Sequence, residues 1–579
     1  MGYTVKKHIQ ILIAMLKEHN IRKVIISPGA TNVVFVGSVQ SDDWFEIYSA
    51  PDERSAAYMA CGLADESGEA VALSCTGATA SRNYMPGLTE AFYRKLPVLA
   101  ITSGITPALP YNNTPQVLDR SILPNDIANG SVVVSDIYSD DDYWKCALNI
   151  NKAILALSAN GGGPAHIQLL SESNLDFSVQ TLPDVNIIKR YTIDDILPDI
   201  DSASRIAVRV GAHKYWDKQL TALVDAFCER YNAVVLCDHS SGYHGKYRIL
   251  EALIGGQEAL DAGKAALDLL IDIGDITANY FVIPVKNVWR ISSDGKISDR
   301  YRKLSKVFAM SEERFFQAYI DKMDRESQTS MYNEFYGLYN ELVGNIPILP
   351  FSNVWIAQQL HDKMPENSYL HLGILNSIRA WNFFEINPSI HSTANTGGFG
   401  IDGALSTTLG ASLADKEKVC FCILGDLAFF YDMNVLGNRH IGKNIRILLI
   451  NNGIGTEFKN YWHPGAMFGT RTNDFIAAGG HYGNKSRNLV RHYAEDLGFE
   501  YMSAANKEEF TAVCKNFLGA DIGDKPIVFE VFTDHDEESE ALKLIRNILK
   551  GNLKQRAKAA IKENVSPSTI SRVKKLLGR

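Results

Sequence analysis

Two apolar runs in the last third of the sequence end in polar residues that suit a hard metal ion. Residues 419–424 lead into Gly425-Asp426, and residues 445–450 lead into Asn451-Asn452. In parallel α/β sheets, ligands bind beyond the carboxyl ends of the strands. A carboxylate and an amide oxygen there match Mg²⁺, which binds few protein groups and completes its shell with phosphate and water. Together the motifs predict a magnesium–diphosphate site, whereas each alone would equally suit a helix cap or a turn.

A third candidate residue is a carboxylate in the first third of the chain. Glu53 lies after a strand pattern and before a helix pattern that is rich in small residues, within APDERSAAYMACGLADESGEAVAL at residues 50–73. A carboxylate held in an apolar site is suited to directing proton transfer. The simpler interpretation is that Asp52 or Glu53 is only a charge at a helix N-terminus.

Alternating strands and helices must position these residues. Short apolar runs, such as residues 23–27, 70–75 and 97–102, each precede a helix-length segment, and similar runs recur up to residues 526–531. This alternation predicts an α/β fold of three doubly wound parallel-sheet domains. A chain of 579 residues is too long for one core, and the predicted joins are residues 184–201 and 344–350.

Composition excludes several classes of function. The chain is 46% hydrophobic and 21% charged, and it contains no uncharged apolar stretch long enough for a transmembrane span or a signal peptide. The eight cysteines lie mostly in apolar runs, which predicts reduced thiols and a cytoplasmic protein. A net charge of −8 argues against nucleic acid as a partner of the body of the protein.

The Gly425-Asp426 step followed by Asn451-Asn452 resembles the signature of thiamine diphosphate enzymes, and the domain order resembles theirs. The resemblance implies thiamine diphosphate and Mg²⁺ as cofactors. It also divides the chain into a pyrimidine-binding domain (1–185), a central domain (195–345), a diphosphate-binding domain (350–540) and a basic C-terminal extension (541–579). The extension suggests either a solvated or docked helix or a contact with nucleic acid or membrane.

One branch matches best, the menaquinone-pathway synthase that joins 2-oxoglutarate to isochorismate. The resemblance rests on Asp52-Glu53-Arg54, on the segment from Gly373 to Arg379, on NTGGFGIDGALSTTLG at residues 395–410, and on Gly425-Asp426-Leu427. It implies that Glu53 hydrogen-bonds to N1′ of the aminopyrimidine and that Ile401 is the apolar wedge under the cofactor. The implied cofactor contacts are Glu53, Thr76, Asn83, Ile401, Gly425, Asp426, Leu427, Asn452, Ile454 and Gly455, of which Asp426, Asn452 and the Ile454 carbonyl would bind Mg²⁺.

The arginines with which that synthase binds its polycarboxylate substrates are mostly absent. The corresponding positions are Thr31, Ile105, Asn279-Tyr280 and Thr396, and only Arg379 and Gln116 keep the family's residue types. We expect Thr31, Gln116, Arg379 and Thr396 to line the substrate site. Without the arginines, buried carboxylates would lack partners, which argues against isochorismate as the acceptor.

The loop after Asn452 also departs from the family. Glu457 and His463 are candidates for general acid–base catalysis, or else solvated charges of a surface loop. Residues 476–490 are an insertion, either a mobile lid or surface decoration.

Three hypotheses about function follow. The first is a thiamine diphosphate-dependent transferase or lyase that decarboxylates a 2-oxoacid donor and ligates the product to a small-molecule acceptor other than isochorismate. The second is a simple decarboxylase that releases an aldehyde, with Glu457 or His463 as the proton source. The third is a non-catalytic scaffold. The resemblance also implies self-association into at least a homodimer, because related enzymes complete each site with two chains.

Overall fold

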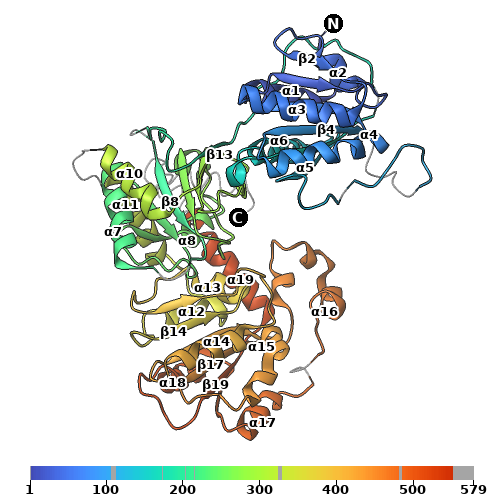
Figure 1. Cartoon of the computed structure of the whole chain (residues 1–579). Coiled ribbons are helices and arrows are strands. Elements are labelled where there is room, and N and C mark those ends of the chain that lie inside the picture. Colours follow the sequence, from blue (N-terminus) through green and yellow to red (C-terminus); the bar gives the residue numbers. More distant parts are fainter. Residues whose placement is uncertain are drawn as a thin grey trace, which may run out of the picture. The chain divides into compact units, whose positions relative to one another are not determined.

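The computed structural model describes residues 2–105, 112–120, 122–172, 174–201, 204–213, 216–323, 329–481 and 485–551. The chain forms two compact units (Figure 1). The first unit is Met1–Ile196 with Gly295–Ala309, and the second is Leu197–Asp294 with Met310–Arg579. Across the described residues the strands form parallel sheets covered by helices, which confirms the predicted α/β class with three such sheets.

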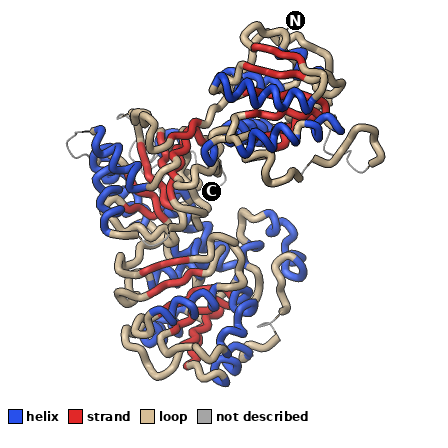
Figure 2. Tube along the Cα trace, in the orientation of Figure 1, coloured by secondary structure: helices blue, strands red, loops and turns tan. Residues whose placement is uncertain are grey.

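The sheet of the first unit has the strand order β2-β1-β3-β4-β6-β5, and the pairs are parallel. Figure 2 shows helices lying against the strands of this unit. Successive residues of β3 point to opposite faces, since Ala72 packs in one core with α1 and α6, and Leu73 packs in the other with α3 and α5. The elements are α1 (Lys7–Glu18), β1 (Lys23–Ile26), α2 (Val33–Val39), β2 (Glu46–Ser49), α3 (Glu53–Ser67), β3 (Val71–Thr76), α4 (Ala78–Asn83), α5 (Met85–Tyr93), β4 (Val98–Gly104), β5 (Ser131–Val134), α6 (Asp140–Ala156) and β6 (Ala165–Leu170). This unit also contains the parallel pair of β7 (Lys189–Tyr191) and β13 (Leu304–Phe308).

The second unit begins with strands in the order β10-β9-β8-β11-β12. The described strands here are again paired in parallel, and β8, β9 and most of β11 are buried. The elements are β8 (Ile206–Val210), α7 (Lys218–Tyr231), β9 (Val234–Cys237), β10 (Arg248–Leu250), α8 (Glu251–Gly255), α9 (Ala262–Ala265), β11 (Leu269–Ile273), β12 (Val288–Ile291), α10 (Glu312–Lys322) and α11 (Ser330–Gly344).

The last sheet, in the same unit, has the order β15-β14-β16-β17-β19-β18. The predicted runs 419–424 and 445–450 are confirmed as the neighbouring buried strands β16 and β17, with Gly425 in register with Ile450. The elements are α12 (Asn353–Leu360), β14 (Tyr369–Leu372), α13 (Asn376–Trp381), β15 (His391–Thr393), α14 (Ala404–Ala414), β16 (Cys420–Gly425), α15 (Asp426–Asp432), β17 (Ile445–Asn451), α16 (Thr472–Phe475), α17 (Leu489–Asp496), β18 (Glu500–Ala504), α18 (Lys507–Phe517), β19 (Ile527–Phe532) and α19 (His535–Arg546).

Three further sequence predictions concern the cysteines, membrane-spanning segments, and the insertion and C-terminal extension. All eight cysteines lie in the described part of the chain and are free thiols, as expected. Of the helices that the structure describes, none is both long enough and apolar enough to span a membrane. Residues 482–484 of the predicted insertion and residues 552–579 of the predicted extension lie outside the described residues.

Candidate functional site

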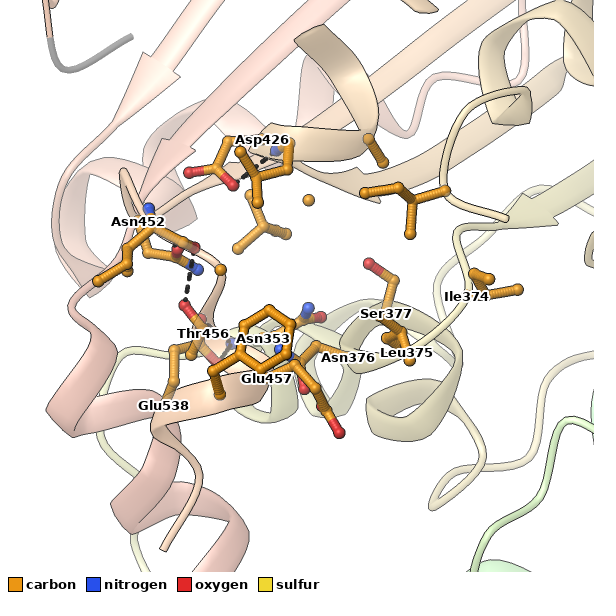
Figure 3. A pocket seen from close by; sticks show the side chains of 18 residues that line it. Asn353, Ile374, Leu375, Asn376, Ser377, Asp426, Asn452, Thr456, Glu457 and Glu538 are labelled. Carbon is orange, nitrogen blue, oxygen red and sulfur yellow. Dashed lines mark hydrogen bonds between the residues drawn. The ribbon is translucent and has the colours of Figure 1, made fainter. Parts of the chain in front are cut away.

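A cavity of about 150 Å³ lies at the carboxyl ends of β14, β16 and β17 in the second unit (Figure 3). We call it the strand-end cavity. It brings together most of the residues that the sequence assigns to the diphosphate half of the site. Its lining is Asn353, Ile374, Leu375, Asn376, Ser377, Ile401, Gly425, Asp426, Leu427, Ala428, Ile450, Asn452, Ile454, Gly455, Thr456, Glu457, Phe458 and Glu538.

Asp426 is the buried carboxylate of this cavity. Its Oδ1 accepts a hydrogen bond from the Leu427 amide at 2.7 Å, and its Oδ2 accepts one from the Gly453 amide at 2.6 Å. Because β16 and β17 are in register, the loop after β17 reaches the residue after β16. Burial raises the pKa of Asp426 to about 6. None of the cationic side chains in the described residues forms an ion pair with it.

The two asparagines after β17 have different environments. Asn451 turns into the core, where its Nδ2 donates to Glu530 Oε1 at 2.6 Å. Asn452 lines the cavity, and its Oδ1 accepts a hydrogen bond from the Ile454 amide at 3.3 Å. The Ile454 carbonyl accepts from Thr456 Oγ1 at 3.3 Å and keeps a second lone pair. The first asparagine is therefore structural, and the second is available to a ligand.

Glu538 is a second buried carboxyl group in the cavity, and the sequence analysis missed it. It accepts hydrogen bonds from the Asn353 amide at 2.9 and 3.1 Å and from Thr533 Oγ1 at 2.8 Å. Burial raises the pKa of Glu538 to about 7, and the charge of Asp426 contributes to the rise. The strand-end rule that singled out Asp426 does not extend to Glu538, which lies six residues after the end of β19, in the first turn of α19.

The donor set of the cavity fits a hard cation and a phosphate group. Two buried carboxyl groups lack a cationic partner among the described residues, and a bound cation would supply the missing charge. A Cβ at Gly425 would meet no atom within 4 Å, so the backbone there is open to a ligand. The described residues contain no cluster of three or more His, Cys, Asp or Glu side chains arranged for a metal. Mg²⁺ prefers a site that offers few protein ligands and in which phosphate oxygens supply further ligands.

Arg379, predicted to bind substrate, forms an ion pair with Glu457. Arg379 Nη1 lies 2.5 Å from Glu457 Oε2, and Nη2 lies 3.0 Å from Oε1. The guanidinium lies near two aromatic rings, with its Cζ 4.8 Å from the Tyr280 centroid and 5.7 Å from that of Trp462. Arg379 is only 4% exposed, whereas Glu457 lines the cavity. A carboxylate of the protein itself therefore occupies the planar fork of this arginine.

Like Arg379, the predicted residues His463 and Thr396 of the second unit do not line the strand-end cavity. His463 precedes a 3₁₀ segment, and its Nδ1 accepts a hydrogen bond from the Gly465 amide at 2.9 Å. Thr396 is buried, and its amide donates to the Ala394 carbonyl at 2.8 Å. Neither residue belongs to the cavity lining, so the structure gives no support to an acid–base role for His463 or to substrate contact by Thr396.

The predicted residues of the first unit lie at the carboxyl edge of its own sheet. Asp52 is the N-cap of α3 and accepts a hydrogen bond from the Ser55 amide at 2.7 Å. Glu53, at the next position, accepts one from Asn83 Nδ2 at 3.0 Å. Of the two acidic residues, Asp52 is therefore the one that caps the helix. The carboxylate of Glu53 is partly exposed. The structure brings Glu53 and Asn83 together.

A second pocket, of about 50 Å³, lies beyond β1, β3 and β4 in the first unit. Thr31, Gln116 and Ile105, the last being a position where the family carries an arginine, line it. Thr31 Oγ1 lies 2.5 Å from Thr76 Oγ1 and donates to the Ser103 carbonyl at 3.1 Å. The pocket also contains Arg120, which the sequence analysis did not single out. We call it the Arg120 pocket.

Comparison with known proteins identifies the family. Residues 6–121 match the model of the thiamine pyrophosphate enzyme, N-terminal TPP binding domain, where thiamine pyrophosphate is another name for thiamine diphosphate. A 2-succinyl-5-enolpyruvyl-6-hydroxy-3-cyclohexene-1-carboxylate synthase of Phocaeicola vulgatus is 30% identical over 563 residues, which are 93% of this chain and 98% of the relative. The chain belongs to this family of thiamine pyrophosphate enzymes.

More distant relatives carry the same name. The synthase of Bacteroides thetaiotaomicron is 29% identical over 563 residues, covering 93% of this chain and 98% of its own. The synthase of Desulfotalea psychrophila is 25% identical over 552 residues, which cover 91% of this chain and 98% of the relative. The sequence similarity to these synthases therefore extends over both units of this chain.

Proposed function

We propose that this family member decarboxylates a 2-oxoacid and transfers the resulting acyl unit to an acceptor that carries no carboxylate at the position of Arg379. The observation that supports this most strongly is the bidentate pair of Arg379 with Glu457. An anionic acceptor would have to displace Glu457 from a buried guanidinium, which leaves a buried charge unpaired. A neutral acceptor leaves the pair intact.

Thiamine diphosphate, when bound, supplies the nucleophilic carbon and the electron sink for loss of CO₂. Asp426, Asn452 and the Ile454 carbonyl would hold Mg²⁺, and the open backbone at Gly425 would approach the diphosphate. Glu53, positioned by Asn83, would hold the proton at the pyrimidine ring. Ile401, which lines the cavity, would support the cofactor as an apolar wedge.

A second candidate function is decarboxylation with release of an aldehyde. The observation in its favour is that Glu457 faces the strand-end cavity and could deliver a proton. Both of its oxygens are engaged by the guanidinium of Arg379, an arrangement that suits ion pairing rather than delivery of a proton to the cavity. We therefore place carboligation first.

The two functions are separated by measuring CO₂ release from 2-oxoacids in the presence of thiamine diphosphate and Mg²⁺. Carboligation predicts slow release that rises when neutral carbonyl acceptors are added, whereas the decarboxylase predicts acceptor-independent release. Glu53→Gln should lower turnover by about 10² or more while the cofactor still raises the unfolding temperature. The matched control is Glu66→Gln, which makes the same change at an exposed position of α3. If the cofactor and Mg²⁺ leave the unfolding temperature of the wild type unchanged, a non-catalytic role replaces both functions.

A further inference from the structure

The Arg120 pocket contains a buried positive charge for which the described residues provide no counter-charge. Arg120 is 5% exposed. The ionisable groups that act on it are Cys75 and Arg82, and none of the described carboxylates is among them. Burial accordingly lowers the pKa of Arg120, although an arginine stays protonated over the whole range in which proteins fold.

A chain of neutral groups holds one side of the guanidinium. Arg120 Nη1 donates to Thr102 Oγ1 at 2.5 Å, and Thr102 Oγ1 lies 2.8 Å from His166 Nε2. On the other side of the imidazole, Nδ1 lies 2.8 Å from Ser131 Oγ. Burial, and then the charge of Arg120, lowers the pKa of His166 to about 3, so the ring is neutral. The chain fixes the orientation of the guanidinium and contributes no negative charge.

The other side of the guanidinium faces the pocket. Among the described residues, none accepts a hydrogen bond from Nε or Nη2 of Arg120. Two glycines make room for the group, because a Cβ at Gly104 would lie 2.7 Å from Nη2 and a Cβ at Gly77 would lie 3.4 Å from Cζ. The remaining space, about 50 Å³, holds a group of a few heavy atoms. Thr31 and Gln116 bound the same space, and the side-chain amide of Gln116 can donate hydrogen bonds.

We propose that Arg120 is an anion-binding residue and that it holds the carboxylate of a small organic acid in this pocket. A buried cation without a partner is strongly unfavourable, and a planar carboxylate accepts two parallel hydrogen bonds from a guanidinium fork. The described lining contains one cationic side chain, which matches the single charge of a carboxylate better than a phosphate dianion. The identity of that acid as a substrate rests on the proposed function, whereas the binding itself does not.

The test is calorimetric titration of the full-length protein with succinate, with succinamide as the uncharged isostere and with inorganic phosphate. Succinate should bind the wild type, and succinamide should not. Arg120→Gln should weaken succinate binding about thirtyfold or more, and Arg120→Lys should weaken it less, because an ammonium keeps the charge without the fork. Arg94→Gln is the control, because Arg94 is exposed and already paired with Asp65 in the same unit.

A structural role for Arg120 would give a different result. Since Arg120→Gln removes an uncompensated buried charge, the unfolding temperature without ligand should be unchanged or higher than that of the wild type. A lower unfolding temperature with unaltered succinate binding would overturn the proposal, as would tighter binding of phosphate than of succinate, or no binding of succinate by the wild type. Succinate binding as expected, together with no CO₂ release from any 2-oxoacid, would leave the proposal standing and remove the proposed function instead.

Discussion

The two buried arginines of the candidate sites differ in charge balance. Arg379 is neutralised by Glu457 within hydrogen-bond distance, whereas Arg120 is held by neutral groups only. Aligning the chain with its family suggested that the substrate arginines are lost at Thr31 and Ile105. The structure places a different arginine in the pocket that both positions line. The pocket of the first unit therefore contains a cationic side chain, whereas the arginine of the second unit is paired with a carboxylate.

Glu457→Gln should destabilise the second unit by about 3–5 kcal/mol, because it leaves the guanidinium of Arg379 buried without its carboxylate. Denaturant-induced unfolding of the variant would measure this. The double variant Glu457→Gln with Arg379→Met should recover most of the loss, since both charges are then absent. The single variant should also gain affinity for acceptors that carry a carboxylate. Equal stability of the single variant and the wild type would show that the pair contributes nothing.

Candidate site residues could be predicted from the sequence where they come directly after the end of a strand. Asp426 and Asn452 were predicted because each directly follows an apolar run, and the structure brings both to one cavity. Arg120 could not be predicted in this way. It lies in a polar segment, and its significance comes from burial against Thr102 and two glycines distant in sequence. The pairing of Glu457 with Arg379 likewise depends on tertiary structure, as the two residues are 78 positions apart.

At the scale of elements, interior strands were predicted well and edge strands poorly. The interior strands β3, β16 and β17 are buried along nearly their whole length, and such strands are continuous apolar runs in the sequence. The edge strand β2 is largely exposed, and β5 is partly so. An edge strand buries less of its surface, so β2, with the sequence EIYS, carries no apolar run that distinguishes it from a loop, although β5 contains three consecutive valines.

Glu538 connects two helices of the second unit, because it lies in the first turn of α19 and accepts the hydrogen bond of the first amide of α12. A carboxylate at a helix N-terminus is favoured by the helix dipole. Glu538→Ala should cost about 1–3 kcal/mol of unfolding free energy, since it leaves that buried amide unsatisfied. Glu538→Gln keeps an acceptor and should cost less. Denaturant unfolding of both variants is the measurement, with Glu537→Ala, an exposed neighbour on α19, as the control. Equal losses for the two alanine variants would exclude this role.

At the scale of the whole molecule, buried histidines should make both units sensitive to acid. Burial lowers the pKa of His166 to about 3 and of His8 to about 4 in the first unit, and of His244 to about 3 and of His371 to about 4 in the second. Each depressed pKa means that the unfolded chain binds more protons than the folded one between the folded pKa and about 6.5. Stability is therefore complete above about pH 6.5 and falls as the pH decreases, by about 1.4 kcal/mol per pH unit for each histidine.

Two carboxyl groups act in the opposite direction. The raised pKa values of Asp426, about 6, and Glu538, about 7, favour the folded state at lower pH and offset part of the loss in the second unit. Unfolding free energies measured between about pH 7 and pH 5 should therefore decrease toward acid. His166→Gln keeps polar contacts to Thr102 and Ser131. It should lower the pH dependence of the first unit's unfolding free energy by the contribution of about one proton taken up on unfolding. An unchanged slope would mean that His166 does not titrate on unfolding in this range.

The assembly of the molecule decides whether Glu53 and Asp426, which belong to different units, act in the same site. We expect a homodimer or a larger oligomer in which the first unit of one chain completes the second unit of another. A heterodimer of one Glu53→Gln chain and one Asp426→Asn chain, purified with two different tags, tests this. If sites are shared between chains, one site of the heterodimer carries both changes and the other carries neither, so about half of the wild-type activity returns. If each chain forms its own site, both sites carry one damaging change and activity stays at the level of the separate variants. Light scattering on the same samples gives the oligomeric state, and a monomer with full activity would contradict the shared site directly.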